Sequence, residues 1–309
     1  MRCLNVIWRR RVLDDFLEAQ FIRTVLLSRL ARPIRWTAIE DDAELPLSDD
    51  LLVCSFGDPG GYLENLRAAG HRNIGVFHFG DERGSDDTSF YGQADYIFRH
   101  YYFSKKLMPP GGFNRDVLWL PNGWARGVGP MRPAALLPFA MRRHGVFFAG
   151  FAGGTDDPIS ERAEMLNALQ AHQIPATVVL SEGFGQGLGP GSYGAYMSDA
   201  KLALVPGGNS PETIRLYDAL ECGALPVVLN RAWLAAPDGL GVLGPPPLPV
   251  LQTWQDLPDA IADFLGARDR DGLEHSSARA VACRQWWGRI KDHCAERVAA
   301  VIETAFAGA

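Results

Sequence analysis

The residues best suited to chemistry by type and spacing lie between Leu202 and Asn230. The apolar run Leu202–Val205 predicts a buried strand, which leads into a Pro-Gly-Gly-Asn turn and then a helix. A helix that begins after such a turn presents free N–H groups and the positive end of its dipole to a bound anion. The segment therefore predicts a βαβ unit that binds an anionic group, and a nucleotide diphosphate is its natural occupant.

Two charged side chains follow on this helix. Arg215 and Asp218 stand three positions apart and share one helical face. A guanidinium binds phosphate oxygens bidentately, and a carboxylate accepts hydrogen bonds from ribose hydroxyls. The alternative is a surface ion pair of small energetic value, and helical geometry alone favours neither interpretation.

The turn and the start of the helix supply the rest of the predicted nucleotide site. Ser210 is expected to be the N-cap, with a proline in the first helical position after it. Gly223 is expected to end the helix in a left-handed conformation. The remaining predicted contacts are Gly207, Gly208, Asn209 and Thr213.

Short apolar runs alternate with helical patterns along the whole chain, which predicts an α/β fold with mostly parallel sheets. In the first half, the expected helices are Leu13–Ala31 and Gly61–Ala69, and the expected strands are Cys3–Trp8, Leu51–Ser55, Asn73–Phe79, Tyr96–Arg99 and Val117–Leu120. In the second half, a helix is expected over Ile159–His172 and strands over Gly145–Ala149, Thr177–Leu180, Leu202–Val205 and Leu225–Leu229.

A segment rich in proline and glycine, residues 121–138, reads as a linker between two doubly wound, Rossmann-like domains. We expect an N-terminal acceptor-side domain over residues 1–135 and a donor domain over residues 136–275. A C-terminal helix over residues 276–309 is expected to return to the first domain. Ligands of such folds bind at the carboxyl ends of the strands, so the site is expected in a cleft between the domains.

Composition excludes several classes of protein. A net charge of −6 argues against a general nucleic-acid binder. The five cysteines include no CxxC pair, and no window approaches the ~20 apolar residues of a membrane span. These features favour a cytoplasmic location. Residues 1–35 hold eight arginines against three acids, which suggests either peripheral contact with a membrane or, as the favoured alternative, a solvated helix face.

One motif carries a family resemblance. The pattern R-x-x-(E/D)-A-L-x-x-G-x-x-P-V resembles the donor-binding motif of exostosin-type glycosyltransferases, family 47, and more loosely that of GT-B glycosyltransferases. Here an aspartate, Asp218, stands where the family usually has glutamate. The matching residues are Arg215, Asp218, Ala219, Leu220, Gly223, Pro226 and Val227.

Fainter similarities extend the match toward the N-terminus. Residues 148–166 resemble the first strand, glycine loop and arginine-bearing helix of a donor domain, which adds Arg162 to the predicted contacts. The Leu120–Trp124 segment is similar to the PNG motif that closes the first domain of many GT-B enzymes, which adds Asn122. The first domain loosely resembles ribitol xylosyltransferases.

The resemblance implies an inverting transfer of sugar without a metal or other cofactor, in which a carboxylate of the first domain deprotonates the acceptor. Asp81 and Glu82 follow a predicted strand at its carboxyl end and are the candidates for this base, Asp81 being preferred. The alternative is that they cap the next helix or pair with Arg83 or Arg99. His78 is a second candidate for the base or a phosphate contact, or else a structural residue.

The family also implies a UDP-sugar donor, with UDP-xylose suggested by the nearest branch, and a glycan or polyol-phosphate acceptor. Two rival functions share the predicted fold. A nucleotide- or glycan-binding module would keep the site without the chemistry. A nucleotide-sugar epimerase would need no acceptor, and it is disfavoured because no GxGxxG motif follows the first strand.

Overall fold

The computed structural model describes residues 3–9, 17–41, 43–46, 50–59, 61–102, 117–151, 160–183, 186–265 and 270–307. The chain forms two compact units. The first comprises Met1–Asn122 together with Lys291–Ala309, and the second comprises Gly123–Ile290. Residues 123–135, which the sequence places in the first domain, thus group with the second unit.

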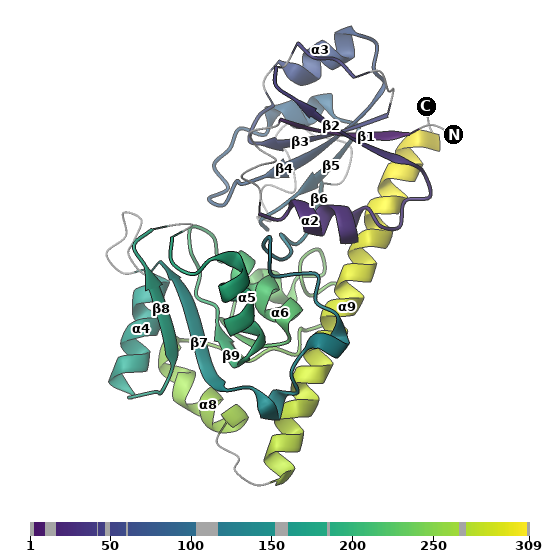
Figure 1. Cartoon of the computed structure of the whole chain (residues 1–309). Helices are drawn as coiled ribbons and strands as arrows, with labels where there is room; N and C mark the ends of the chain where they lie inside the picture. The colour runs from purple at the N-terminus through teal and green to yellow at the C-terminus, as the bar shows by residue number, and fades with distance from the viewer. Residues whose placement is uncertain are drawn as a thin grey trace. The chain divides into compact units, whose positions relative to one another are not determined.

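The first unit is built on a six-stranded parallel sheet in the order β2-β1-β3-β4-β5-β6 (Figure 1). Because β2 and β3 flank β1 on opposite sides, the chain reverses its direction across the sheet between β1 and β3. Such a switch point is where ligands of α/β sheets bind. The strands are β1 (Leu4–Arg9), β2 (Ile34–Ile39), β3 (Asp50–Phe56), β4 (Asn73–Phe79), β5 (Tyr96–Arg99) and β6 (Val117–Trp119).

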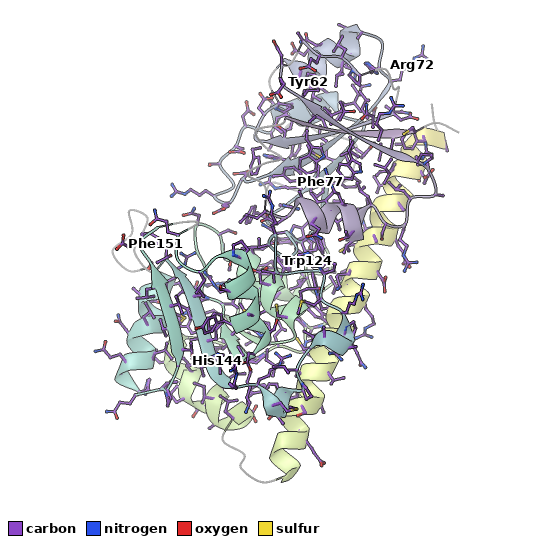
Figure 2. All side chains as sticks on the ribbon, in the orientation of Figure 1. Tyr62, Arg72, Phe77, Trp124, His144 and Phe151 are labelled. Atoms are coloured by element: carbon purple, nitrogen blue, oxygen red, sulfur yellow. The ribbon has the colours of Figure 1, made fainter. Side chains whose placement is uncertain are left out.

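Buried aliphatic side chains of the central strands form the core of this unit. Val53 and Val76 pack with Leu63 and Leu66 of α3 (Tyr62–Ala68). Both β3 and β4 are buried along nearly their whole length, as expected of parallel strands covered on both faces. Figure 2 shows Phe77 within the sheet of this unit and Tyr62 at the start of α3.

Two sequence predictions need correction in the first unit. The helix expected over Leu13–Ala31 is limited, among the described residues, to α2 (Ala19–Phe21) and the π-helical turn η1 (Ile22–Leu26). Strand β2 was not predicted. It is an edge strand with mixed exposure, so it lacks the continuous apolar run that identifies a buried strand. A 3-10 turn, η2 (Ser89–Gln93), precedes β5.

The end of α9 (Arg270–Ala307) is attached to the first unit by arginines. Arg32 forms an ion pair with Glu303, and its guanidinium lies 3.6 Å from the centre of the Phe306 ring. Arg29 pairs with Asp292 at 3.0 Å.

The second unit contains a five-stranded parallel sheet in the order β11-β10-β9-β7-β8. Here the direction across the sheet reverses between β7 and β9, because β8 lies on the other side of β7. Figure 1 shows α5 and α6 side by side, with α4 on the opposite side of β7 and β8. The strands are β7 (His144–Phe151), β8 (Thr177–Ser181), β9 (Ala200–Leu204), β10 (Leu225–Leu229) and β11 (Val250–Leu251).

Six helices belong wholly or partly to the second unit among the described residues. Helices α5, α7 and the 3-10 turns were not predicted, because they are short or interrupted by glycine. The helices are α4 (Glu161–Ala171), α5 (Pro190–Ser198), α6 (Ile214–Cys222), α7 (Ala232–Ala235), α8 (Leu257–Leu265) and α9, and the 3-10 turns are η3 (Pro133–Ala135), η4 (Phe139–Met141) and η5 (Trp254–Asp256).

The start of α6 differs from the prediction. Thr213, and not Ser210, is the N-cap, and its hydroxyl accepts the N–H of Arg215. The Ser210 hydroxyl instead accepts the N–H of Glu212. Glu212 is buried and accepts the hydroxyl of Tyr217, which holds the segment before Thr213 outside the helix.

Helix α6 is also buried all round, whereas the sequence predicts one polar face. Gly223 does end it in the left-handed conformation, with φ +70°, as predicted. No helix in the described part of the chain has the length and apolar character needed to span a membrane.

Candidate functional site

The carboxyl ends of β7 and β9 meet at the switch point of the second unit. His144 and Phe151 mark the opposite ends of β7, with Phe151 at its carboxyl end (Figure 2). Strand β9 runs parallel to β7 and leads into the Gly207–Gly208 turn. The predicted nucleotide residues therefore gather where ligands of this fold class bind.

Arg215 reaches the end of β7 from the first turn of α6. Its Nε and Nη2 atoms both donate to the carbonyl of Ala149, at 3.2 and 3.0 Å. Its guanidinium lies 4.9 Å from the centre of the Phe148 ring. The neighbouring residue must be a glycine, because a Cβ at Gly150 would stand 2.5 Å from Nη2 of Arg215, and φ there is +151°.

The third nitrogen of the Arg215 guanidinium is not compensated. Among the described residues, Nη1 is buried without a hydrogen-bond partner, and no acid forms an ion pair with Arg215. Arg215 as a whole is only 9% exposed. A buried cationic donor without an acceptor is costly, and it is the feature expected where an anion binds.

Arg162 supports the glycine turn from the same strand end. Its Nη1 donates to the carbonyl of Phe151 at 2.7 Å, and its Nε donates to the carbonyl of Gly207 at 3.2 Å. A Cβ at Gly208 would lie 2.7 Å from Nη2 of Arg162. Two guanidinium groups therefore meet the main chain at the end of β7, and the absence of side chains in the turn makes room for one of them.

The acids around this site are paired or easily neutralised. Glu161 forms a 2.6 Å ion pair with Arg231. Burial raises the pKa of Asp218 to about 7, although the N–H of Ala125, the Tyr193 hydroxyl and the charge of Arg215 all oppose this shift. Neither acid forms an ion pair with Arg215 among the described contacts.

Asp218 has a structural partner besides its predicted role. Its Oδ1 atom accepts the N–H of Ala125 at 2.8 Å, and the side chain is 1% exposed. The ribose contact therefore stays a prediction, with one carboxylate oxygen already bound to the main chain. Of the remaining predicted residues, Gly208 and Asn209 are exposed, Gly207 and Ser210 are buried, and Thr213 lies between these extremes.

A small crevice lies beside this turn, at the ends of β9 and β10, with room for about one water molecule. Val205, Leu229 and Trp233 contribute to its apolar wall, and the Glu161–Arg231 ion pair contributes its charged groups.

One of the predicted acids of the first unit, Asp81, belongs to a buried network centred on Arg99. The Nη2 atom of Arg99 donates to Oδ2 of Asp81 at 2.6 Å, while its Nη1 donates to the Tyr91 hydroxyl at 3.0 Å. Nη1 also lies 3.2 Å from Nδ1 of His78, and Nε2 of His78 lies 3.0 Å from Oδ2 of Asp86.

This network assigns the tautomer of His78. Because a guanidinium is a donor only, the Nδ1 atom that faces Arg99 must be the acceptor. The proton is then on Nε2, which donates to Asp86. Burial and the charge of Arg99 lower the pKa of His78 and keep its ring neutral. His78 thus acts as a hydrogen-bond donor toward Asp86.

The two predicted bases have different surroundings. Burial opposes ionisation of Asp81, but bonds from Arg99 and from the N–H groups of Asp86 and Ser85 outweigh it and lower the pKa of Asp81. Glu82 is half-buried and accepts the Tyr101 hydroxyl at 3.2 Å. Tyr101 has a left-handed backbone, φ 57°, which is uncommon outside glycine and frequent near functional sites.

His78, Asp81 and Asp86 bring potential metal ligands within 4.8 Å of one another. The Arg99 guanidinium, however, already binds Asp81 and shares Nδ1 of His78. A fixed cation at this distance would repel a metal ion. The three side chains therefore fit a hydrogen-bonded network better than a metal centre.

Asn122 follows β6 and is almost fully buried, at 1% exposure. Neither its amide oxygen nor its amide nitrogen has a hydrogen-bond partner among the described residues. A buried amide without a bond is unusual, and its predicted substrate contact stays a prediction.

The alternative that an acid pairs with Arg99 is confirmed for Asp81. Sequence reasoning did not link Arg99, Tyr91 or Asp86 to His78, because this network joins three separate segments. Gly150, which follows the predicted strand Gly145–Ala149 and lies within β7, was not among the predicted contacts. The glycine loop expected within residues 148–166 falls largely at 152–159, outside the described residues.

No protein-family model matches the chain, and no curated protein matches it by sequence. The structure is similar to that of an O-GlcNAc transferase from Thermobaculum terrenum, solved as a mutant, with a TM-score of 0.52 and 14% sequence identity. The match covers 99% of this chain and 66% of that protein. The likeness shows a glycosyltransferase-like α/β fold with two parallel sheets.

Proposed function

We propose that this chain is a glycosyltransferase that takes its sugar from a nucleotide-diphosphate sugar bound to the second unit. The uncompensated guanidinium of Arg215 carries the proposal. It is buried, permanently charged and short of one acceptor, and it stands at the start of α6 beside the glycine turn.

A diphosphate satisfies each of these features. Its oxygens accept hydrogen bonds from Nη1 of Arg215, and its negative charge offsets that of the buried guanidinium. The dipole of α6 favours the same anion. When the bond to the sugar breaks, these groups stabilise the leaving diphosphate without a metal ion.

Two further observations support sugar transfer over other uses of a nucleotide. The motif from Arg215 to Val227 resembles that of exostosin-type enzymes of the GT-B class, and the solved structure with a similar fold is itself a glycosyltransferase.

The finer parts of the proposal come from the family resemblance. They are a UDP-sugar donor, with UDP-xylose as the first choice, a glycan or polyol-phosphate acceptor, and inversion at the sugar carbon. The acceptor proton passes to a carboxylate of the first unit, and the sequence nominates Asp81 or Glu82.

A binding module without catalysis is the second candidate, because Asp218 already uses one oxygen on the Ala125 main chain. A single experiment separates the two functions. The protein is heated with UDP, UDP-xylose, UDP-N-acetylglucosamine or, as a control, NAD, and the shift in melting temperature is measured. A nucleotide present at 100 times its Kd stabilises the fold by about 2.7 kcal/mol.

The donor that stabilises the protein is then incubated with it and a panel of methyl glycosides and ribitol phosphate, and products are identified by mass spectrometry. A glycosylated product supports the enzyme. Stabilisation without any product supports the binding module, and no stabilisation by a UDP compound contradicts both.

A further inference from the structure

A buried carboxyl shares helix α6 with the guanidinium of the proposed donor site. Asp218 follows Arg215 by three positions, which places both side chains on the same side of the helix. Asp218 is 1% exposed and Arg215 is 9% exposed, so water screens the interaction between them weakly. The charge of Arg215 favours the ionised form of Asp218. An anion that binds to Arg215 therefore acts on Asp218 as well.

Two neutral hydrogen-bond donors enclose the same carboxyl. The N–H of Ala125 donates to Oδ1 of Asp218 at 2.8 Å, and the Tyr193 hydroxyl of α5 forms a second hydrogen bond with this side chain. Both bonds favour the carboxylate, whereas burial favours the neutral acid. Arg215 is the cation among the titratable and charged groups that surround Asp218, which are Tyr193 on α5 and Arg215, Glu221 and Cys222 on α6.

A diphosphate bound to Nη1 of Arg215 changes the balance between the two forms of Asp218. Its negative charge offsets the charge of Arg215 and repels a carboxylate in the same buried region. A neutral Asp218 avoids this repulsion and keeps its structural contacts. One oxygen still accepts the N–H of Ala125, the other carries the proton, and the Tyr193 hydroxyl can accept a hydrogen bond as well as donate one.

We propose that Asp218 takes up a proton from solvent when a nucleotide-diphosphate sugar binds to Arg215, and this inference rests on the proposed function. No bond of the donor forms or breaks in this step. Burial raises the pKa of Asp218 to about 7, so both of its forms are present in the free protein at neutral pH. Donor affinity is highest at low pH, where Asp218 is already protonated, and it falls as the pH rises through neutrality.

Calorimetric titration counts the protons that enter with the donor. The ligand is UDP-xylose or UDP-N-acetylglucosamine, whichever stabilises the fold more, because the phosphate groups of a UDP-sugar do not titrate between pH 6 and pH 9. Heats measured in HEPES and in Tris, whose enthalpies of ionisation differ, give the number of protons taken up for each donor bound. We expect about half a proton near pH 7.5 and a Kd that rises about tenfold between pH 6 and pH 9.

Two variants assign the proton to Asp218. Asp218→Asn cannot ionise, so it should bind the donor without proton uptake and with one affinity from pH 6 to pH 9. Tyr193→Phe removes a bond that favours the carboxylate, so the fall in affinity should move to higher pH. Asp199→Asn is the control, because bonds from Arg143 keep that acid ionised over this range, and the variant should keep the wild-type proton count.

Three results would overturn the inference: a wild-type Kd that does not change with pH, proton uptake that persists in a folded Asp218→Asn variant, or a wild-type pH profile in Tyr193→Phe. The last result decides the matter if melting curves show that Asp218→Asn does not fold. Failure of the proposed function has a separate sign, because no UDP-sugar then binds to the wild type at any pH.

Discussion

Replacing Asp218 by asparagine should remove a pH-dependent loss of stability from the second unit. Burial raises the pKa of Asp218 to about 7, from an ordinary value of 3.8. At a pH between these two pKa values, Asp218 is protonated in the folded protein and ionised in the unfolded chain. The folded state is therefore penalised progressively as the pH rises from about 4 to about 7.

The size of the penalty follows from the difference between the folded and unfolded pKa values. A tenfold change in the acid dissociation constant corresponds to about 1.4 kcal/mol, so the full penalty is at most about 4 kcal/mol, and the part that develops between pH 5 and pH 8 is about 2 to 3 kcal/mol. Asparagine cannot ionise, but its amide oxygen can still accept the N–H of Ala125. The variant should be the more stable protein at pH 8.

Urea unfolding at pH 5 and pH 8 measures this effect. The difference in unfolding free energy between the two pH values should shrink by about 2 to 3 kcal/mol in Asp218→Asn. Asp199→Asn is the control, since bonds from Arg143 overcome burial and lower the pKa of Asp199. The stabilisation from ionised Asp199 is lost only when the pH falls below the ordinary pKa of the group. Asp199→Asn should therefore lower the free energy of unfolding equally at pH 5 and pH 8. An unchanged pH difference in Asp218→Asn would refute the reasoning.

Two glycines give further predictions. Gly150→Ala should weaken UDP binding in a calorimetric titration, because the new Cβ would stand 2.5 Å from Nη2 of Arg215. Gly191→Ala is the control and should bind UDP like the wild type, because the space around Gly191 is open. Equal affinities of the two variants would contradict the proposed position of the guanidinium. Gly75→Ala should lower the free energy of unfolding in urea by about 1–3 kcal/mol, because its Cβ would meet the Tyr96 ring at 2.1 Å. An unaltered urea midpoint would show that the strand relaxes freely.

The strands that the sequence predicts best are those buried on both faces. Strands β4 and β10 are continuous apolar runs, and no helix pattern competes with them. Strand β2 escaped prediction because an edge strand half exposed to solvent has no such run. The alternation of strand and helix patterns therefore predicted the fold class, but it did not predict every strand.

Side chains of the candidate site were easier to predict than their partners. Residue type and spacing singled out Arg215, but its acceptor is the carbonyl of Ala149, 66 positions earlier. The N-cap was misplaced because serine and threonine both suit that position, and the choice of Thr213 depends on the buried bond between Glu212 and Tyr217. The bond between Asp86 and His78 could not be predicted from local spacing, because it arises only in the fold.

The affinity of UDP for Arg215→Met tests the central claim most directly. Methionine preserves much of the length of the side chain and removes its charge. Arg279→Met is the matched control, because Arg279 also lies over a phenylalanine ring, Phe264, and pairs with Asp263 away from the proposed site. Loss of a charged hydrogen bond is expected to raise the Kd for UDP on the order of 10- to 100-fold.

Calorimetric titration gives both Kd values, and melting curves without ligand show that each variant is folded. We predict that Arg215→Met loses most of its affinity for UDP and that Arg279→Met binds like the wild type. Wild-type affinity in a folded Arg215→Met variant would contradict the account.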